Sequence, residues 1–171
     1  VVASQLKVNE IIKQSGSSIT IGVDGDTVSG PFTAQPLFYA YITGTQAVSN
    51  ATETRVALET ELFDTGSCFN TTTYRFTPNK AGYYFLVGSL QINSASDFDG
   101  WQVNIYKNGS EIAHMNGRSE YYNVHKNQVV AHANGSSDYF ELFARQDSGG
   151  SLNINPGQIR SYFFGYRLVG E

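Results

Sequence analysis

The chain has few of the residues that hold small proteins together covalently or give them a strongly charged surface. Its 171 residues include one cysteine, Cys68, so no disulfide can form within a single chain. Charged residues make up 15% of the sequence, and no basic cluster exceeds two residues, which argues against nucleic-acid binding. No apolar run reaches the ~18 residues of a membrane-spanning helix, so membrane insertion is not expected. Stability must therefore come from packing and, we expect, from association between chains.

The sequence also lacks the motifs of the common enzyme classes. It contains no Gly-x-Ser-x-Gly elbow, Walker loop, dinucleotide fingerprint or His-Glu-x-x-His. None of its histidines pair at the spacing of a zinc site, although a histidine ring at an oligomer axis stays open; they are His114, His125 and His132. Acidic pairs such as Asp138 and Glu141 would serve a glycosidase only across a cleft of set width. We therefore predict that the protein is not an enzyme.

Two further sites have a plain and a chemical interpretation. Asp97-Phe98-Asp99-Gly100 supplies two local carboxylates, whereas calcium needs several oxygen ligands. We expect an Asx turn there, with a calcium site as the alternative, and we expect no other cofactor. We expect Cys68 to be a small buried residue, with a reactive thiol or an interchain bridge as the alternative.

The composition that is present is typical of a turn-rich β protein. Hydrophobic residues make up 40% and aromatic residues 13% of the chain, and Gly, Ser, Thr and Asn are abundant. About eight to ten short strands at this spacing point to a sandwich or jelly roll. Alternating apolar residues predict several of them, including residues 37–42, 101–106, 121–133 and 138–145. Residues 55–63 have helical propensity, but Val56, Leu58 and Leu62 keep a period of two, and we predict a strand.

Residues 69–90 organise the rest of the chain. Two strand-like runs flank a Pro-Asn-Lys-Ala-Gly turn, and the second run is apolar on both faces. The two faces of that run carry Tyr84 and Leu86 on one side and Tyr83, Phe85 and Val87 on the other. A strand that is apolar on both faces is covered on both faces, and a small domain has only one core. We expect another copy of the chain to supply the second covering.

The last strand repeats this pattern. Tyr162, Phe164 and Tyr166 share one face, while Phe163 and Gly165 share the other. Two such strands indicate a sheet that lines an oligomer axis, because aromatic residues are enriched in interface cores. The alternative is a monomeric sandwich with a thick core and some exposed tyrosines. The predicted trimer interface consists of Tyr84, Leu86, Tyr162, Phe164 and Tyr166.

Six residues in the middle of the chain have a characteristic spacing: Leu58, Asp64, Phe69, Phe76, Gly82 and Tyr84. The spacing resembles the diagnostic pattern of the complement component 1q globular domain, within the tumour necrosis factor-like jelly rolls. The family usually has aromatics where this chain has Leu58, Leu86 and Gly88. Its opening strand, Lys-Asn-Gly hairpin and closing strand resemble residues 38–41, 106–109 and 161–166. The resemblance covers about residues 37–171 and implies an all-β, trimeric jelly-roll sandwich.

Residues 1–36 form a separate N-terminal β segment and linker. Residues 6–12 and 19–23 alternate like short strands, but they contain too few apolar residues for a core of their own. Pro31 and Pro36 interrupt regular pairing, which puts the predicted boundary between residues 36 and 37. The opening segment resembles fibre and appendage proteins of tailed bacteriophages. That resemblance implies attachment to other virion structural proteins, or trimerisation, ahead of a receptor-binding head.

These observations together predict a homotrimeric, non-enzymatic virion appendage that binds a host cell-surface glycan or protein. The alternatives are a secreted, extracellular recognition or adhesion protein, a capsid decoration without a receptor, and a polysaccharide-cleaving enzyme. Loop aromatics and amides suit glycan or protein recognition, and they include Phe98, Asn116, Arg118, Tyr121 and Asn123. The same residues are ordinary loop composition, so the sequence assigns no ligand-binding residue.

Overall fold

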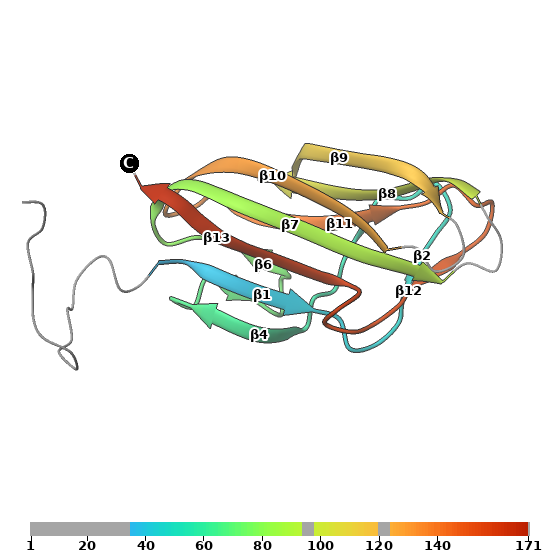
Figure 1. The fold of residues 1–171 in the computed structure, drawn as a ribbon, viewed down its shortest axis with the longest axis horizontal. Helices are drawn as coiled ribbons and strands as arrows, with labels where there is room; N and C mark the ends of the chain where they lie inside the picture. Colours follow the sequence, from blue (N-terminus) through green and yellow to red (C-terminus); the bar gives the residue numbers. More distant parts are fainter. Residues whose placement is uncertain (1–34, 94–97, 120–123, 171) are drawn as a thin grey trace, which may run out of the picture. The chain divides into compact units, whose positions relative to one another are not determined.

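The structure is a computed structural model that describes residues 35–93, 98–119 and 124–170. All regular secondary structure in these ranges is β-strand. The strands form a seven-stranded and a six-stranded sheet (Figure 1). The predicted all-β sandwich is confirmed. Residues 1–34 lie outside the described residues, so the N-terminal strands and the 36/37 boundary stay predictions.

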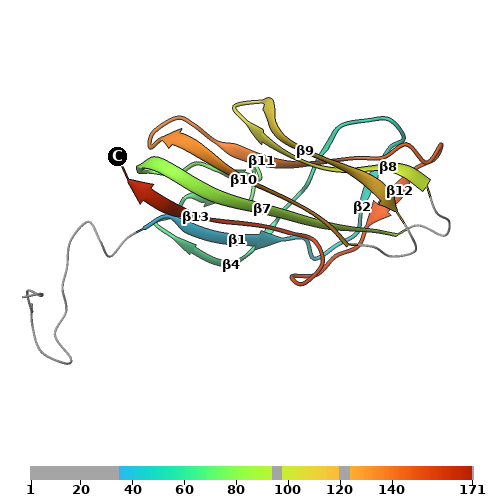
Figure 2. The same cartoon turned by 45° about the horizontal axis from the view of Figure 1, so that its top comes forward.

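The seven-stranded sheet has the order β2-β12-β7-β13-β1-β4, and β10 also pairs with β7. All of these pairings are antiparallel. The strands are β1 (Leu37–Tyr41), β2 (Gln46–Val48), β4 (Thr60–Thr65), β7 (Ala81–Asn93), β10 (Val124–Asn134), β12 (Leu152–Ile154) and β13 (Tyr162–Gly170). The two long aromatic runs of the sequence, β7 and β13, are therefore neighbours in the middle of this sheet (Figure 2).

The six-stranded sheet has the order β5-β6-β11-β8-β9, and β3 pairs with β11. Its strands are β3 (Thr54–Arg55), β5 (Phe69–Asn70), β6 (Arg75–Phe76), β8 (Phe98–Lys107), β9 (Ser110–Ser119) and β11 (Phe140–Arg145). The turn between β8 and β9 contains Asn108 and Gly109, both with positive φ. This is the hairpin that the Asn-Gly pair predicts.

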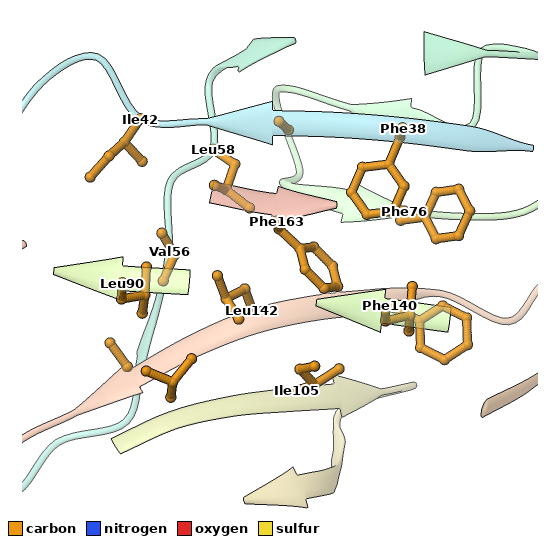
Figure 3. Close-up of a cluster of buried hydrophobic side chains, with 14 of the residues drawn as sticks. Phe38, Ile42, Val56, Leu58, Phe76, Leu90, Ile105, Phe140, Leu142 and Phe163 are labelled. Carbon is orange, nitrogen blue, oxygen red and sulfur yellow. The ribbon is translucent and has the colours of Figure 1, made fainter. Parts of the chain in front are cut away.

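The core lies between the two sheets. Phe38 of β1 is fully buried and stacks on Phe69 and Phe76, with ring centroids 5.2 and 4.2 Å away. It also meets Phe163 edge-on at 5.1 Å. Figure 3 shows side chains of both sheets meeting in this layer, among them Phe38, Phe163, Ile105, Phe140 and Leu142. One continuous apolar layer therefore holds the sandwich together.

The spacing pattern of the sequence has a physical basis in this fold. The Asp64 carboxylate accepts hydrogen bonds from the backbone N–H groups of Cys68 (3.1 Å) and Phe69 (2.9 Å), which fixes the turn after β4. Gly82 has a φ of 145°, and a Cβ there would lie 2.3 Å from the carbonyl oxygen of Val169. Only glycine fits that approach between β7 and β13.

Two predicted strands differ from the structure. The run from Phe69 to Thr77 is not one strand but two short ones, β5 and β6. The Asn70 side-chain oxygen accepts hydrogen bonds from the backbone N–H groups of Thr72 and Thr73, both at 2.9 Å, and so turns the chain between them. Residues 55–63 are not helical, but only parts of them are strand, in β3 and β4.

The period of two also fails at one position of that segment. Val56 and Leu58 are buried as predicted, whereas Leu62 is exposed. The register between β1 and β4 shifts between Tyr39 and Ala40. Such a bulge turns the following residues to the opposite face, so alternation cannot be extended through it.

The strand β8 is covered more fully than its pattern predicts. Trp101, Val103 and Ile105 face the core, as expected, and are fully buried. Gln102 and Asn104, on the opposite face, are also buried. The strand is therefore covered on both faces.

Candidate functional site

The outward face of the seven-stranded sheet carries a continuous group of aromatic rings. In the register of the sheet, Tyr166 lies opposite Phe85, Phe164 opposite Tyr39, and Tyr39 opposite Phe63. Side chains at directly opposed positions share one face of a sheet. We call this group the aromatic face; it consists of Tyr39, Phe63, Tyr83, Phe85, Tyr162, Phe164 and Tyr166.

The rings of the aromatic face touch one another across the strands. Tyr39 is 4.9 Å from Tyr162 and 5.8 Å from Phe63, centroid to centroid. Tyr166 is 5.8 Å from both Phe164 and Phe85. Aromatic pairs at these separations stabilise each other beyond the burial of their area. The rings are thus held in place before any partner binds.

The aromatic face is open in the single chain. Tyr83 is 48% exposed and Tyr166 37% exposed. The outward positions of the described strands β7, from 83 to 87, and β13, from 162 to 166, carry no charge. Exposed Val130 and Val169, which lie opposite Phe85 and Tyr83 in the register of the sheet, extend the apolar surface. A contiguous apolar patch, rich in tyrosine and phenylalanine and without charge at its centre, is typical of the core of a protein interface.

Two of the predicted interface residues lie on the wrong face. Tyr84 and Leu86 are fully buried in the core of the subunit. The Tyr84 ring packs against Phe76 at 5.6 Å, and its hydroxyl donates to the backbone carbonyl of Lys80 at 2.7 Å. They cannot reach a partner, and this part of the prediction is corrected. Tyr83 and Phe85 take their place on the outward face of β7.

Tyr162, Phe164 and Tyr166 do lie on the outward face, as the sequence predicts. Alternation alone assigns residues to two faces but does not say which one is inside. The small residues of β7 and β13 carry that information. A Cβ on Gly88 would lie 2.2 Å from Leu142 of the other sheet, so the even-numbered positions of β7 face the core.

Two polar groups on or beside the aromatic face have partners within the subunit. The Tyr39 hydroxyl donates to the backbone carbonyl of Gln158. Burial, and then the neighbouring Tyr162 phenol, raise the pKa of Tyr39 to about 12. The His132 ring lies edge-on to Tyr83 at 5.3 Å. The sequence leaves open a histidine at an oligomer axis, and the pairing of His132 with Tyr83 across β10 and β7 puts this histidine on the same face of the sheet.

The three histidines do not converge. His114 of β9 lies 3.5 Å from a Glu111 carboxylate oxygen. His125 of β10 is buried, and burial lowers its pKa. In the part of the chain that the structure describes, no three His, Cys, Asp or Glu side chains are grouped as metal ligands would be. Asp99, from the candidate calcium loop, is exposed, and Asp97 lies outside the described residues.

The acidic residues that a glycosidase would have used, Asp138 and Glu141, are engaged with basic and amide groups. The Asp138 carboxylate forms an ion pair with the Lys107 ammonium at 2.8 Å and accepts a hydrogen bond from the side-chain amide of Asn108 at 2.7 Å. Glu141 is almost fully buried and pairs with both Arg55 and Arg75 at 3.0 Å. Sequence reasoning missed this cluster, because its residues come from three strands that are far apart in the chain.

Cys68 has its plain interpretation in the structure. The residue is buried and free, and burial raises the pKa of its thiol. A thiol with a raised pKa forms little thiolate near neutral pH, so it is a poor nucleophile.

Among the described residues, no helix is long and apolar enough to cross a membrane.

The fold is shared with proteins of very different sequence. No family model and no curated protein matches the chain. Among solved structures, murine APRIL matches with a TM-score of 0.58 and 12% identity, over 78% of this chain and 99% of that one. The globular domain of zebrafish complement 1qA matches with a TM-score of 0.52 and 13% identity, over 80% and 99%. The PRD1 vertex protein P5 matches with a TM-score of 0.54 and 9% identity, over 78% and 97%.

These matches define the class of fold. The chain is a jelly-roll sandwich of the tumour necrosis factor-like type, as the spacing pattern implied. The identities are too low to carry more than the fold.

Proposed function

We propose that the chain is the subunit of a homotrimeric, non-enzymatic recognition module, and that the aromatic face is the contact between its subunits. One observation carries the proposal: an uncharged layer of tyrosine and phenylalanine rings lies on the outward face of the seven-stranded sheet, away from the subunit's own core. Burying such rings removes apolar area from water and stabilises association.

We propose a closed ring of copies rather than a filament. A contact that joins two different parts of one surface generates a ring when the rotation closes. The aromatic face extends from Phe63 on β4 to Tyr83 on β7, so one part of it can meet a different part of the neighbouring copy. The jelly-roll fold shared with the complement 1qA globular domain supports three as the number of copies.

We further propose that this module is part of a virion and contacts the host surface. The resemblance of the opening segment, residues 6–21, to phage fibre segments supports attachment to other virion proteins, and the shared fold of a phage vertex protein is compatible with it. Three copies present three identical binding surfaces. Linked sites raise the strength of weak single-site binding to a host glycan or protein by orders of magnitude.

The likeness to the complement 1qA domain supports a second candidate, a secreted recognition or adhesion protein. Detection of the chain in purified virions would decide for the virion. A trimer that is present in virions but has no effect on adsorption would leave a structural capsid decoration.

Two measurements on the full chain test the proposal. Sedimentation or light scattering is expected to give three times the 18.8 kDa mass of one chain. Added protein is expected to block adsorption of the virus to its host. A stable monomer at concentrations of about 10 to 100 µM, with the aromatic face in water, would overturn the trimer, since obligate interfaces are far tighter.

A further inference from the structure

A second cluster lies on the outward face of the six-stranded sheet. The carboxylate of Glu141 on β11 is almost fully buried, with its side chain 3% exposed. Arg55 of β3 donates through Nη1, and Arg75 of β6 through Nε, to the same Oε1 atom, each at 3.0 Å. One carboxylate neutralises one guanidinium. The cluster therefore keeps one positive charge.

Most of the donors of the two arginines remain unused. A guanidinium carries five N–H donors in a planar fork. The guanidinium of each arginine makes a single hydrogen bond within the described residues, the one to Glu141. Their side chains are 40% and 36% exposed. The remaining donors are thus open to water at the surface of the sheet.

Two tyrosine rings hold the guanidiniums in position. The Arg75 guanidinium carbon lies 4.0 Å from the ring centre of Tyr139, and that of Arg55 lies 5.7 Å from the ring centre of Tyr74. These are cation–π distances. Each arginine is fixed by a carboxylate on one side and a ring on the other, so little entropy is lost when it binds an anion.

We propose that Arg55 and Arg75 form a binding site for the anionic group of a surface saccharide. The planar fork of a guanidinium matches the two oxygens of a carboxylate or phosphate, and each such pair is a charge-assisted bond. Tyr74 and Tyr139 are partly exposed beside the guanidiniums, where a bound sugar ring would contact them. Glu141 acts as a positioning residue. The anionic group is either the carboxylate of an acidic sugar or the phosphate of a phosphorylated one.

This inference deepens the proposed function and depends on it for the biological role of the ligand. The Arg55–Arg75 site lies on the sheet that does not carry the aromatic face. Assembly through the aromatic face would therefore leave the site open, with one copy on every subunit.

The test is a titration of the full-length protein, followed by NMR or calorimetry. The probes are a uronic-acid oligosaccharide, a phosphorylated hexose and a neutral hexose. We expect saturable binding of one or both anionic probes and none of the neutral sugar. Preference for one anionic probe identifies the source of the charge. The absence of binding for all three probes, or equal binding of the neutral sugar, would overturn the inference.

Variants locate the site. Arg55→Gln is expected to weaken binding on the order of tenfold, the value of one charge-assisted hydrogen bond. Arg160→Gln makes the same chemical change at an exposed arginine outside the cluster and should bind like wild type. Arg55→Lys keeps the charge beside Glu141 and protects folding, but it loses the fork and should also bind weakly. Unchanged binding in both Arg55 variants would refute the assignment.

The failure of this inference differs from a failure of the proposed function. In one outcome, the wild-type trimer and the Arg55 variants block host adsorption equally well. That result would reject the saccharide site and leave the recognition module intact. In the converse outcome, Arg55→Gln abolishes saccharide binding while the wild-type protein has no effect on adsorption. That result would support the site and reject the host role.

Discussion

Removing one ring from the aromatic face should weaken the trimer by a calculable amount. Tyr166 is 37% exposed in the single chain. With about 200 Å² for a tyrosine, this leaves ~75 Å² for a partner to cover, or ~2 kcal/mol per subunit at about 25 cal/mol per Å². Three subunits lose ~6 kcal/mol, which raises the trimer dissociation constant by about four powers of ten. The protein concentration at which half of the trimer dissociates varies as the square root of this constant, so that concentration rises about a hundredfold.

The assay is sedimentation velocity of Tyr166→Ala over a dilution series, beside wild type. The change removes ring contacts within the subunit as well, so circular dichroism is needed to show that the fold is kept. Ile159→Ala is the matched control, because Ile159 is 77% exposed and lies outside the aromatic face. It should assemble like wild type. Equal midpoints for wild type and Tyr166→Ala, in two folded proteins, would refute the role of the aromatic face.

Three further predictions concern stability. Gly82→Ala should lower the free energy of unfolding in urea by about 3 kcal/mol or more, because the added Cβ would lie 2.3 Å from a backbone oxygen. The control Gly149→Ala, at a positive φ with open space around it, should lower it by only about 1 kcal/mol. Similar losses in the two variants would contradict the clash. Glu141→Gln should lower the unfolding free energy by about 1 to 2 kcal/mol, since its two arginines lose their carboxylate but stay partly hydrated; an unchanged denaturation midpoint would show that the cluster does not stabilise the fold. The hydrogen bonds from Lys107 and Asn108 lower the pKa of Asp138 from 3.8 to about 2, so the ionised carboxylate stabilises the fold above pH 3.8 and this contribution is lost as the pH falls toward 2. Asp138→Asn should show a smaller loss of melting temperature over that window, and a parallel decline in both proteins would reject the assignment.

Local chemistry made the class of fold predictable from the sequence. Asp64, Gly82 and Tyr84 of the spacing pattern each have a role that depends on only one or two neighbouring strands. Asp64 accepts backbone hydrogen bonds in a turn, and Gly82 allows a close approach of two strands because it has no Cβ. Tyr84 places its ring in the core and donates its hydroxyl to a backbone carbonyl. Such roles leave a spacing in the chain. The alternation of β13 likewise assigned Tyr162, Phe164 and Tyr166 to one face correctly.

What failed depended on the tertiary structure. The choice between Tyr84 and Tyr83 as the outward residue requires knowing which side of β7 the second sheet covers, and both sides are aromatic. The exposure of Leu62 requires knowing a bulge in the pairing of β4 with β1. The Arg55–Glu141–Arg75 cluster joins three strands, and no local spacing connects them.

The two outward faces of the sandwich favour different kinds of partner. The aromatic face has no charge along the centre of β7 and β13, so its burial against a copy of itself costs little desolvation of charged groups. The opposite sheet keeps two half-exposed guanidiniums around a buried carboxylate, and burial of that surface in an apolar interface would be costly. The first face is therefore suited to permanent assembly and the second to contact with a hydrated, anionic ligand. A homotrimer that buried the arginine face and left the rings in water would contradict this assignment at both surfaces.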